Sequence, residues 1–150
     1  DVLGSRGLGD VYKRQHVFMQ GYVKELNELY KTEPALYELD SSPEGFTWIN
    51  CNSANTSLLS YVRKGKKESD TLLIICNFTP MEHKAYKLAT PSGGRWQEIF
   101  SSDNNRYGGE GRNNKTVKQA KKAECDGQEH YISVTVPPLS ISVFKKKIGK

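Results

Sequence analysis

The chain has 150 residues, of which 36% are hydrophobic and 26% charged, with a formal net charge of +5. This composition predicts one globular domain with its own core and excludes a disordered chain. No apolar run approaches the ~20 residues of a membrane span and no signal-peptide pattern opens the chain, so we expect a cytoplasmic protein without a membrane partner. A (β/α)8 barrel needs about 250 residues, which excludes a whole barrel.

Metal, cofactor and nucleic-acid binding are not indicated either. Cys51, Cys76 and Cys125 lack the close pairing of a zinc motif or a disulfide framework, so we expect reduced, structural cysteines and no metal or cofactor. The positive charges form short separate clusters within 63–67, 118–122 and 145–147. No nucleic-acid-binding motif accompanies them, so we expect no nucleic-acid partner.

Residues 1–15 are expected to be a non-native leader. They carry Gly4, Gly7 and Gly9 among scattered charges, without a helical or strand period that persists. The glycine spacing does not match a phosphate-binding loop, because no strand precedes it and no Lys-Ser/Thr pair follows. We interpret the segment as translated vector or misjoined sequence.

An amphipathic helix is predicted over 19–31, where apolar side chains recur every three or four residues, as at Tyr22, Leu26 and Leu29. Pro34 ends this helix and can begin a second short one. A one-sided apolar helix needs a surface to cover. That surface belongs either to the downstream β region or to an absent upstream domain.

After residue 40 the pattern changes to short β-branched and aromatic runs between turn signals. The predicted strands are 46–49, 58–63, 72–77, 85–88, 96–100, 131–136 and 140–145. Seven short strands without interleaved helices predict an all-β, antiparallel β-sandwich.

Three segments give finer expectations. The run 72–76 is apolar on both pleat faces, which predicts a central strand covered on each side. The run 131–136 alternates, which predicts that Ile132, Val134 and Val136 face the core. Residues 101–127 are polar and aperiodic, which predicts a long surface loop.

The titratable residues give no catalytic signature. A retaining glycosidase needs two carboxylates about 5 Å apart, and no acidic pair, catalytic histidine pattern or nucleophile motif stands out. Aromatic rings are more suggestive, since sugars stack on exposed aromatic faces. Trp48, Trp96, Tyr86 and Tyr107 qualify by type. The patterns around Trp48 and Trp96 favour core positions, and Tyr107 is the best candidate for an exposed ring.

An ordered series of motifs resembles the end of bacterial 1,4-α-glucan (glycogen) branching enzymes. The matching residues include Pro34-Ala35-Leu36, Glu38-Leu39-Asp40, Pro43-Glu44-Gly45-Phe46-Thr47-Trp48-Ile49, Asn77-Phe78-Thr79-Pro80, Tyr107-Gly108-Gly109 and Ser133-Val134-Thr135-Val136-Pro137-Pro138-Leu139. The resemblance covers about residues 16–145. The Lys-rich stretch 115–122 is a departure from the family pattern.

The resemblance implies that residues 16–40 are terminal helices of a truncated catalytic barrel and that residues 41–150 are a C-terminal β-sandwich of the α-amylase type. It also implies glycogen biosynthesis: a glycosyltransferase that moves α-1,4-glucan segments to form α-1,6 branches. The family's catalytic carboxylates belong to the upstream barrel, so we expect no catalytic residue here. The implied partners are that barrel and an α-glucan, with Tyr107, Trp48 and Trp96 as candidate glucan contacts. The alternative is a stand-alone carbohydrate-binding β-sandwich module.

Overall fold

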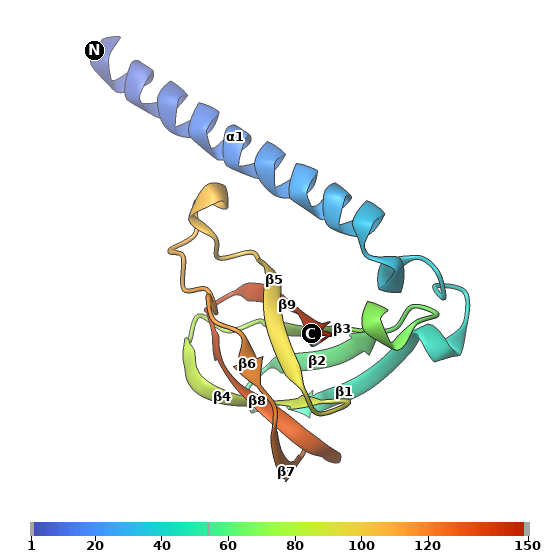
Figure 1. Cartoon of the computed structure of the whole chain (residues 1–150). Coiled ribbons are helices and arrows are strands. Elements are labelled where there is room, and N and C mark those ends of the chain that lie inside the picture. Colours follow the sequence, from blue (N-terminus) through green and yellow to red (C-terminus); the bar gives the residue numbers. More distant parts are fainter. Residues whose placement is uncertain (1, 54, 149–150) are drawn as a thin grey trace.

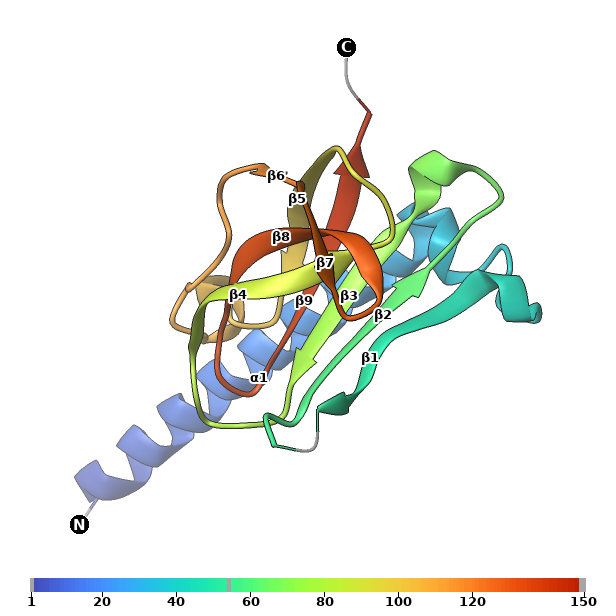
Figure 2. The same ribbon diagram turned by 90° about the horizontal axis from the view of Figure 1, so that it is seen from below.

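Two antiparallel sheets and one long helix form three layers (Figures 1 and 2). The computed structural model describes residues 2–53 and 55–148. The larger sheet has six strands in the order β1-β2-β3-β9-β5-β6, and the smaller has three in the order β4-β8-β7. The helical elements are α1 (Val2–Thr32), η1 (Pro34–Leu36), η2 (Pro43–Gly45), η3 (Glu68–Asp70) and η4 (Asn105–Tyr107). The strands are β1 (Phe46–Ser53), β2 (Leu58–Arg63), β3 (Leu72–Asn77), β4 (His83–Thr90), β5 (Arg95–Ser101), β6 (Lys118–Gln119), β7 (Lys121–Cys125), β8 (Gln128–Val136) and β9 (Ser140–Lys147).

The predicted all-β sandwich and its seven strands are confirmed. β2 and β3 have the predicted ends, and the other five strands are longer than predicted. All six residues of β3 are buried, and the strand lies between β2 and β9 as a central strand should. Ile132, Val134 and Val136 are at most 2% exposed, as the alternation in β8 predicted.

The prediction of a loop throughout 101–127 is wrong in its second half, which forms β6 and β7. β7 is an edge strand of the smaller sheet and its first four side chains are exposed, so it lacks a buried face and shows no hydrophobic alternation. Asp126 and Gly127 have φ of 48° and 74° between β7 and β8. This Asp-Gly pair is the hairpin signal that identifies the missed strand.

The helix is longer than the predicted 19–31. α1 begins at Val2 and includes most of the segment interpreted as a leader, and its first part extends beyond the sandwich (Figure 1). Helical backbone geometry does not require an amphipathic pattern, which is why the periodicity missed it. The native or non-native origin of residues 1–15 stays a prediction. At the other end, the predicted second helix is only the single 3-10 turn η1.

The main core fills the space between the two sheets. Trp96 and Phe144 are its largest side chains, and both are fully buried. Leu73 and Ile75 of β3 join this core from the larger sheet, and β8 covers it from the smaller one.

A second core lies on the opposite face of the larger sheet, under α1. Leu72 and Ile74 of β3 point to this side, because successive side chains of a strand alternate between faces. Tyr22, Leu26 and Leu29 of α1 pack against them. The helix therefore covers part of the sheet's outer face.

The main core predicts the cost of a cavity. Replacing Ile75, which is fully buried, by Ala should lower the free energy of unfolding by about 2–5 kcal/mol, measured by urea denaturation. Val117→Ala, at a side chain 43% exposed, is the control and should change it by less than about 0.5 kcal/mol. Equal effects of the two substitutions would contradict the position of the core.

Candidate functional site

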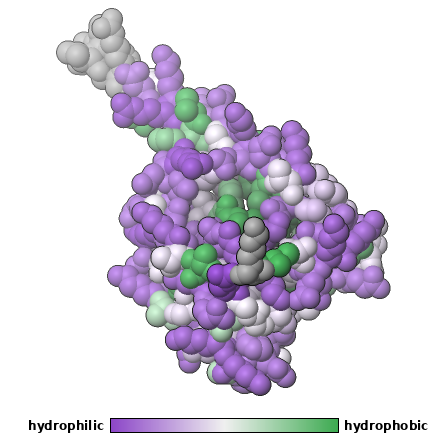
Figure 3. Space-filling view, viewed as in Figure 1, coloured by the Kyte–Doolittle hydropathy of each residue, from purple (hydrophilic) through white to green (hydrophobic). Residues whose placement is uncertain are grey.

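A cleft of about 640 Å³ opens where α1 leaves the outer face of the larger sheet incompletely covered. Figure 3 shows hydrophobic side chains within a hollow beside the helix. We call it the aromatic cleft, because six of its thirteen lining side chains are aromatic. It is lined by Tyr22, Leu26, Leu29, Tyr30, Leu36, Phe46, Trp48, Tyr61, Arg63, Ile74, Phe100, Ile141 and Val143.

Three aromatic rings on β1 and β2 form one wall of the cleft. Trp48 lies opposite Tyr61 in the strand pairing, and their ring centroids are 5.8 Å apart. Phe46 meets Trp48 edge-on at 4.9 Å and stacks on Tyr61 at 5.2 Å. Trp48 nevertheless remains 49% exposed. The three rings fix one another's positions while leaving the indole open to solvent.

Arg63 is the one charged side chain among the lining residues, and its charge is already compensated. Its guanidinium donates hydrogen bonds to the carbonyl oxygens of Ala35 and Leu36, each at 3.3 Å. It also forms a 2.6 Å ion pair with Asp40. These bonds join β2 to the segment after α1, so the arginine has a structural role. Burial also raises the pKa of Tyr61, which keeps its phenol protonated and neutral.

The end of α1 is tied to the sheet by a partly buried ion pair. Nζ of Lys145 on β9 donates to the Glu33 carboxylate at 2.7 Å, and the Glu33 side chain is 12% exposed. Glu33 precedes Pro34, whose ring disfavours helical geometry at the residue before it. The pair therefore holds the helix where its backbone leaves the helical path.

The loop that carries η4 contacts the middle of α1. Tyr107 meets Tyr22 edge-on at 5.4 Å, and Arg106 forms a 2.8 Å ion pair with Glu25. Gly108 has φ of 82°, and a Cβ there would lie 2.9 Å from the ring of Phe18. The left-handed backbone and the close contact both favour glycine at this position.

Two further carboxylates accept hydrogen bonds from the loops of this region. Asp103 accepts hydrogen bonds from the backbone N–H groups of Glu110 and Arg112. Glu98 accepts from the backbone N–H and the side-chain amide of Asn114, and burial raises its pKa. Among the described residues no group of three or more His, Cys, Asp or Glu is placed to hold a metal ion.

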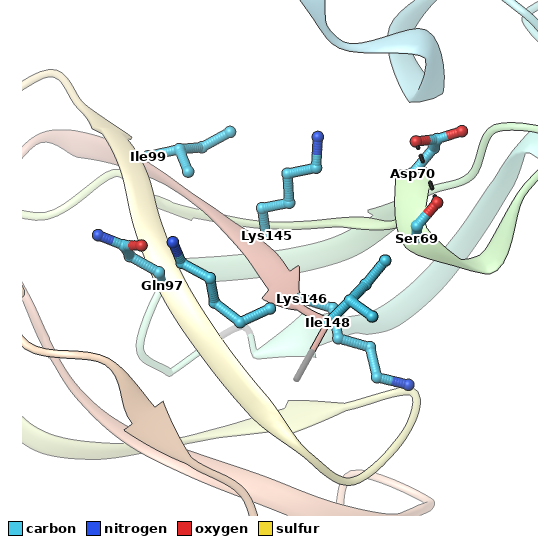
Figure 4. Close-up of a pocket in the computed structure, with 8 residues that line it drawn as sticks. Ser69, Asp70, Gln97, Ile99, Lys145, Lys146 and Ile148 are labelled. Carbon is cyan, nitrogen blue, oxygen red and sulfur yellow. Dashed lines mark hydrogen bonds between the residues drawn. The ribbon is translucent and has the colours of Figure 1, made fainter. Parts of the chain in front are cut away.

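A second pocket lies at the end of β9 (Figure 4). Lys145 rises from β9 between Ile99 of β5 and the Ser69–Asp70 turn, and it is paired with Glu33. Lys146 is paired with Glu68 at 2.6 Å, which lowers the pKa of that carboxyl. Two of the three lysines that line this pocket are therefore already paired with carboxylates.

The structure separates the three candidate glucan contacts. Trp96 is fully buried in the main core, so it offers no ring face to a sugar. The expectation that Trp96 contacts a glucan does not agree with this burial. Tyr107, expected to be the most exposed, uses its ring against α1. Trp48 is exposed and lines the aromatic cleft. Sequence reasoning missed Phe46 and Tyr61, although the alternation of Phe46 and Trp48 in one strand was a usable signal.

The fold defines a β-sandwich domain with an attached helix. Residues 48–147, two thirds of the chain, match the family described as "Alpha amylase, C-terminal all-beta domain". The chain belongs to this family. No helix in the described part of the chain is long and apolar enough to cross a membrane.

The similar proteins are named 1,4-alpha-glucan branching enzyme GlgB. The protein from Oceanobacillus iheyensis is 43% identical over 90% of this chain and 21% of its own length. Those from Gloeobacter violaceus and Aquifex aeolicus are each 41% identical, over 89% and 87% of this chain and 18% and 21% of their own lengths. The chain therefore spans about a fifth of these relatives. A crystal structure of alpha-amylase from H. orenii aligns with a TM-score of 0.43 and 16% identity, over 79% of this chain and 18% of that one.

The contact between Tyr107 and α1 predicts a pH dependence. Burial, then the charge of Glu25 and a hydrogen bond to it, raise the pKa of Tyr107 from 10.0 to about 12. The contribution of the neutral phenol to stability is therefore complete below pH about 10 and is lost as the pH rises through about 12. Tyr107→Phe should lower the free energy of unfolding by about 1 kcal/mol near neutral pH, and the difference from the parent chain should vanish toward pH about 12.

Urea denaturation across that pH range measures the difference. Tyr37→Phe, at a ring 42% exposed, is the matched control and should change the free energy of unfolding near neutral pH by less than about 0.5 kcal/mol. A difference between Tyr107→Phe and the parent that stays constant up to pH about 12 would contradict the role of the phenolic proton.

Proposed function

We propose that this chain is the C-terminal, non-catalytic part of a cytoplasmic 1,4-α-glucan branching enzyme of glycogen synthesis. The observation that carries the proposal is the match to proteins of that name at 37–43% identity over about nine tenths of the chain. In such an enzyme a catalytic domain would transfer an α-1,4-glucan segment to a 6-hydroxyl. The present domain would support that catalytic domain.

The bonding of the carboxylates favours a structural role for this domain over a catalytic one. Glu33, Asp40 and Glu25 neutralise basic side chains that attach α1 and the following segment to the sandwich. Asp103 and Glu98 accept hydrogen bonds from loop amides. A glycosidase needs one carboxylate free as a nucleophile and a second one beside it as an acid. The chain alone should therefore not branch amylose.

An exposed apolar stripe on α1 supports docking of a further domain. Met19, Val23 and Tyr30 are 61%, 46% and 53% exposed. At about 100° per residue their positions fall within roughly 40° of one another around the helix, so they form one stripe. Tyr22 and Leu29 pack on the sheet instead. The helix thus has one apolar side that is covered and another that is open, and we assign the open one to the catalytic barrel.

The first experiment is to sequence the source DNA upstream of the codon for His16. We expect an uninterrupted reading frame that encodes a barrel, and we expect that longer protein to branch amylose, measured by the shift of the iodine spectrum. The 150-residue chain assayed alone should give no shift. A promoter and start codon directly before residue 1, or branching by the chain alone, would contradict the proposal.

Docking on the stripe predicts a specific loss in the longer enzyme. The double substitution Met19→Asp and Val23→Asp should lower the melting temperature of its catalytic domain by several degrees, because it places two charges in an apolar contact. The same change in the 150-residue chain should have little effect, since both side chains are exposed there. Lys24→Asp, about 140° around the helix from Met19, is the control. An unchanged catalytic domain would remove the stripe from the interface.

A further inference from the structure

We propose that the free edge of β7 binds an extended, acidic segment of a partner protein, which adds to the smaller sheet as a further strand. This interaction is separate from the branching reaction and from its glucan. It gives a role to the Lys-rich stretch 115–122, which departs from the pattern of the family.

The first argument is the position of β7 in the fold. It is the outermost strand of the smaller sheet and pairs with β8 on its inner side, and its first four side chains are exposed. Within the described residues no strand pairs with its other side, so the backbone N–H and C=O groups there are open to a further strand. Figures 1 and 2 show β7 on the side of the sandwich away from α1, so a domain docked on the open stripe of α1 would leave this edge free.

The second argument is a surplus of positive charge along this edge. Residues 115–125 contain one glutamate and four lysines, namely Lys115, Lys118, Lys121 and Lys122. Across residues 2–53 and 55–148, none of these lysines forms an ion pair. The charge of Lys118 acts on the buried Glu98, which leaves Lys121 and Lys122 as the free cations of β7. Glu124 accepts a hydrogen bond from the backbone N–H of Gly127 in the hairpin turn at 3.0 Å.

The two lysines of β7 lie on opposite faces of the strand. Lys121 is opposite Tyr131 and Lys122 is opposite His130, and successive residues of a strand alternate between faces. Nζ of Lys87 lies 5.3 Å from the centroid of the Tyr131 ring, so a second ammonium group is present on the face of Lys121. An incoming strand with acidic side chains would meet lysines on either face, and cross-strand pairs of opposite charge are favourable.

The end of β7 is held in place before a partner binds. The Cys125 thiol donates a hydrogen bond to the carbonyl oxygen of Lys87 at 3.5 Å, and the Asn50 amide donates one to the Asp126 carboxylate at 2.9 Å. These contacts join the end of the strand and its turn to β4 and β1. The edge is therefore already extended, and only the incoming segment has to become ordered on binding.

The chemistry of this edge disfavours two other occupants. A second copy of the chain would bring its own β7, and the lysines of the two strands would repel one another. A nucleic acid is bound through an element that enters a groove or through free aromatic faces, but Lys87 covers the Tyr131 ring and Trp96 is fully buried. Backbone pairing requires another polypeptide, and charge complementarity favours an acidic one.

A synthetic peptide tests strand addition on the 150-residue chain. The probe is a peptide of about nine residues, with Glu at about half of its positions on both faces and Val or Thr between them. We expect saturable binding, measured by fluorescence anisotropy, that weakens as NaCl is added. Hydrogen exchange of backbone amides within 121–124 should slow, because those that point away from β8 gain a partner.

Two control peptides separate backbone pairing from charge alone. One keeps every Glu but has Pro at alternate positions, which removes N–H groups needed for pairing, and the other has Lys in place of Glu. Each should bind at least about tenfold more weakly than the probe. Equal binding of the Pro peptide would overturn strand addition, and equal binding of the Lys peptide would overturn the selection for acidic side chains.

Charge reversal tests the position of the site. The double substitution Lys121→Glu and Lys122→Glu should weaken binding of the acidic probe about tenfold and strengthen binding of the Lys peptide. Lys66→Glu with Lys67→Glu is the matched control, because it changes the net charge equally at an exposed lysine pair outside β7. The control should bind the probe like the parent chain, and thermal melts check that both variants are folded. Parent-like binding by the β7 variant would overturn the assignment.

Two further outcomes would overturn the inference. One is a single-stranded RNA that binds more tightly than the acidic probe and loses its affinity in the β7 variant, which would assign the edge to a nucleic acid. The other is no binding of any probe, since the lysines would then only keep β7 from pairing with other edges. None of these results depends on whether the source DNA encodes a barrel, so the proposed function stands or fails separately.

Discussion

The structure depends on one strand that is apolar on both faces. β3 cannot lie at an edge or face water, because each side of it would then expose a row of aliphatic side chains. Leu73 and Ile75 require the smaller sheet on one side, while Leu72 and Ile74 require α1 on the other. The three-layer order follows from this single constraint. The helix is therefore part of the domain's packing rather than an appendage, although all of it precedes the residues that match the family.

The helix satisfies this requirement only in part, and the cleft is the result. One helix is about 10 Å across, whereas the sheet it covers has six strands spaced about 4.8 Å apart. The side near β1 and β2 stays uncovered, and the sequence places Phe46, Trp48 and Tyr61 there instead of charged side chains. Rings that pack on one another can remain at a water-facing edge without collapsing into the core. The cleft thus arises from a mismatch in width between two layers.

Most of the fold could be predicted from the sequence, because the strands that carry the cores have strong two-residue or continuous apolar patterns. What failed has local physical causes. β7 has no buried face, so the only sequence signal that indicates this strand is the Asp-Gly turn that follows it. Trp96 and Phe100 are four residues apart and should share a face, yet they lie in different cores, because a register shift between Glu98 and Phe100 inserts one residue. The exposure of Tyr107 was overestimated, since its packing partner lies far away in the sequence, on α1.

The aromatic residues divide between core and surface for the same physical reason. Whether a tryptophan is a core residue or a binding platform depends on what crosses over it, and that is set by tertiary packing rather than by its neighbours in sequence. Trp96 is covered because the smaller sheet closes over β5 on the core side. Trp48 stays open because it lies on an edge strand beyond the width of α1. Its openness is therefore a property of the layered arrangement, and any partner that widened the helical layer over β1 would bury the indole.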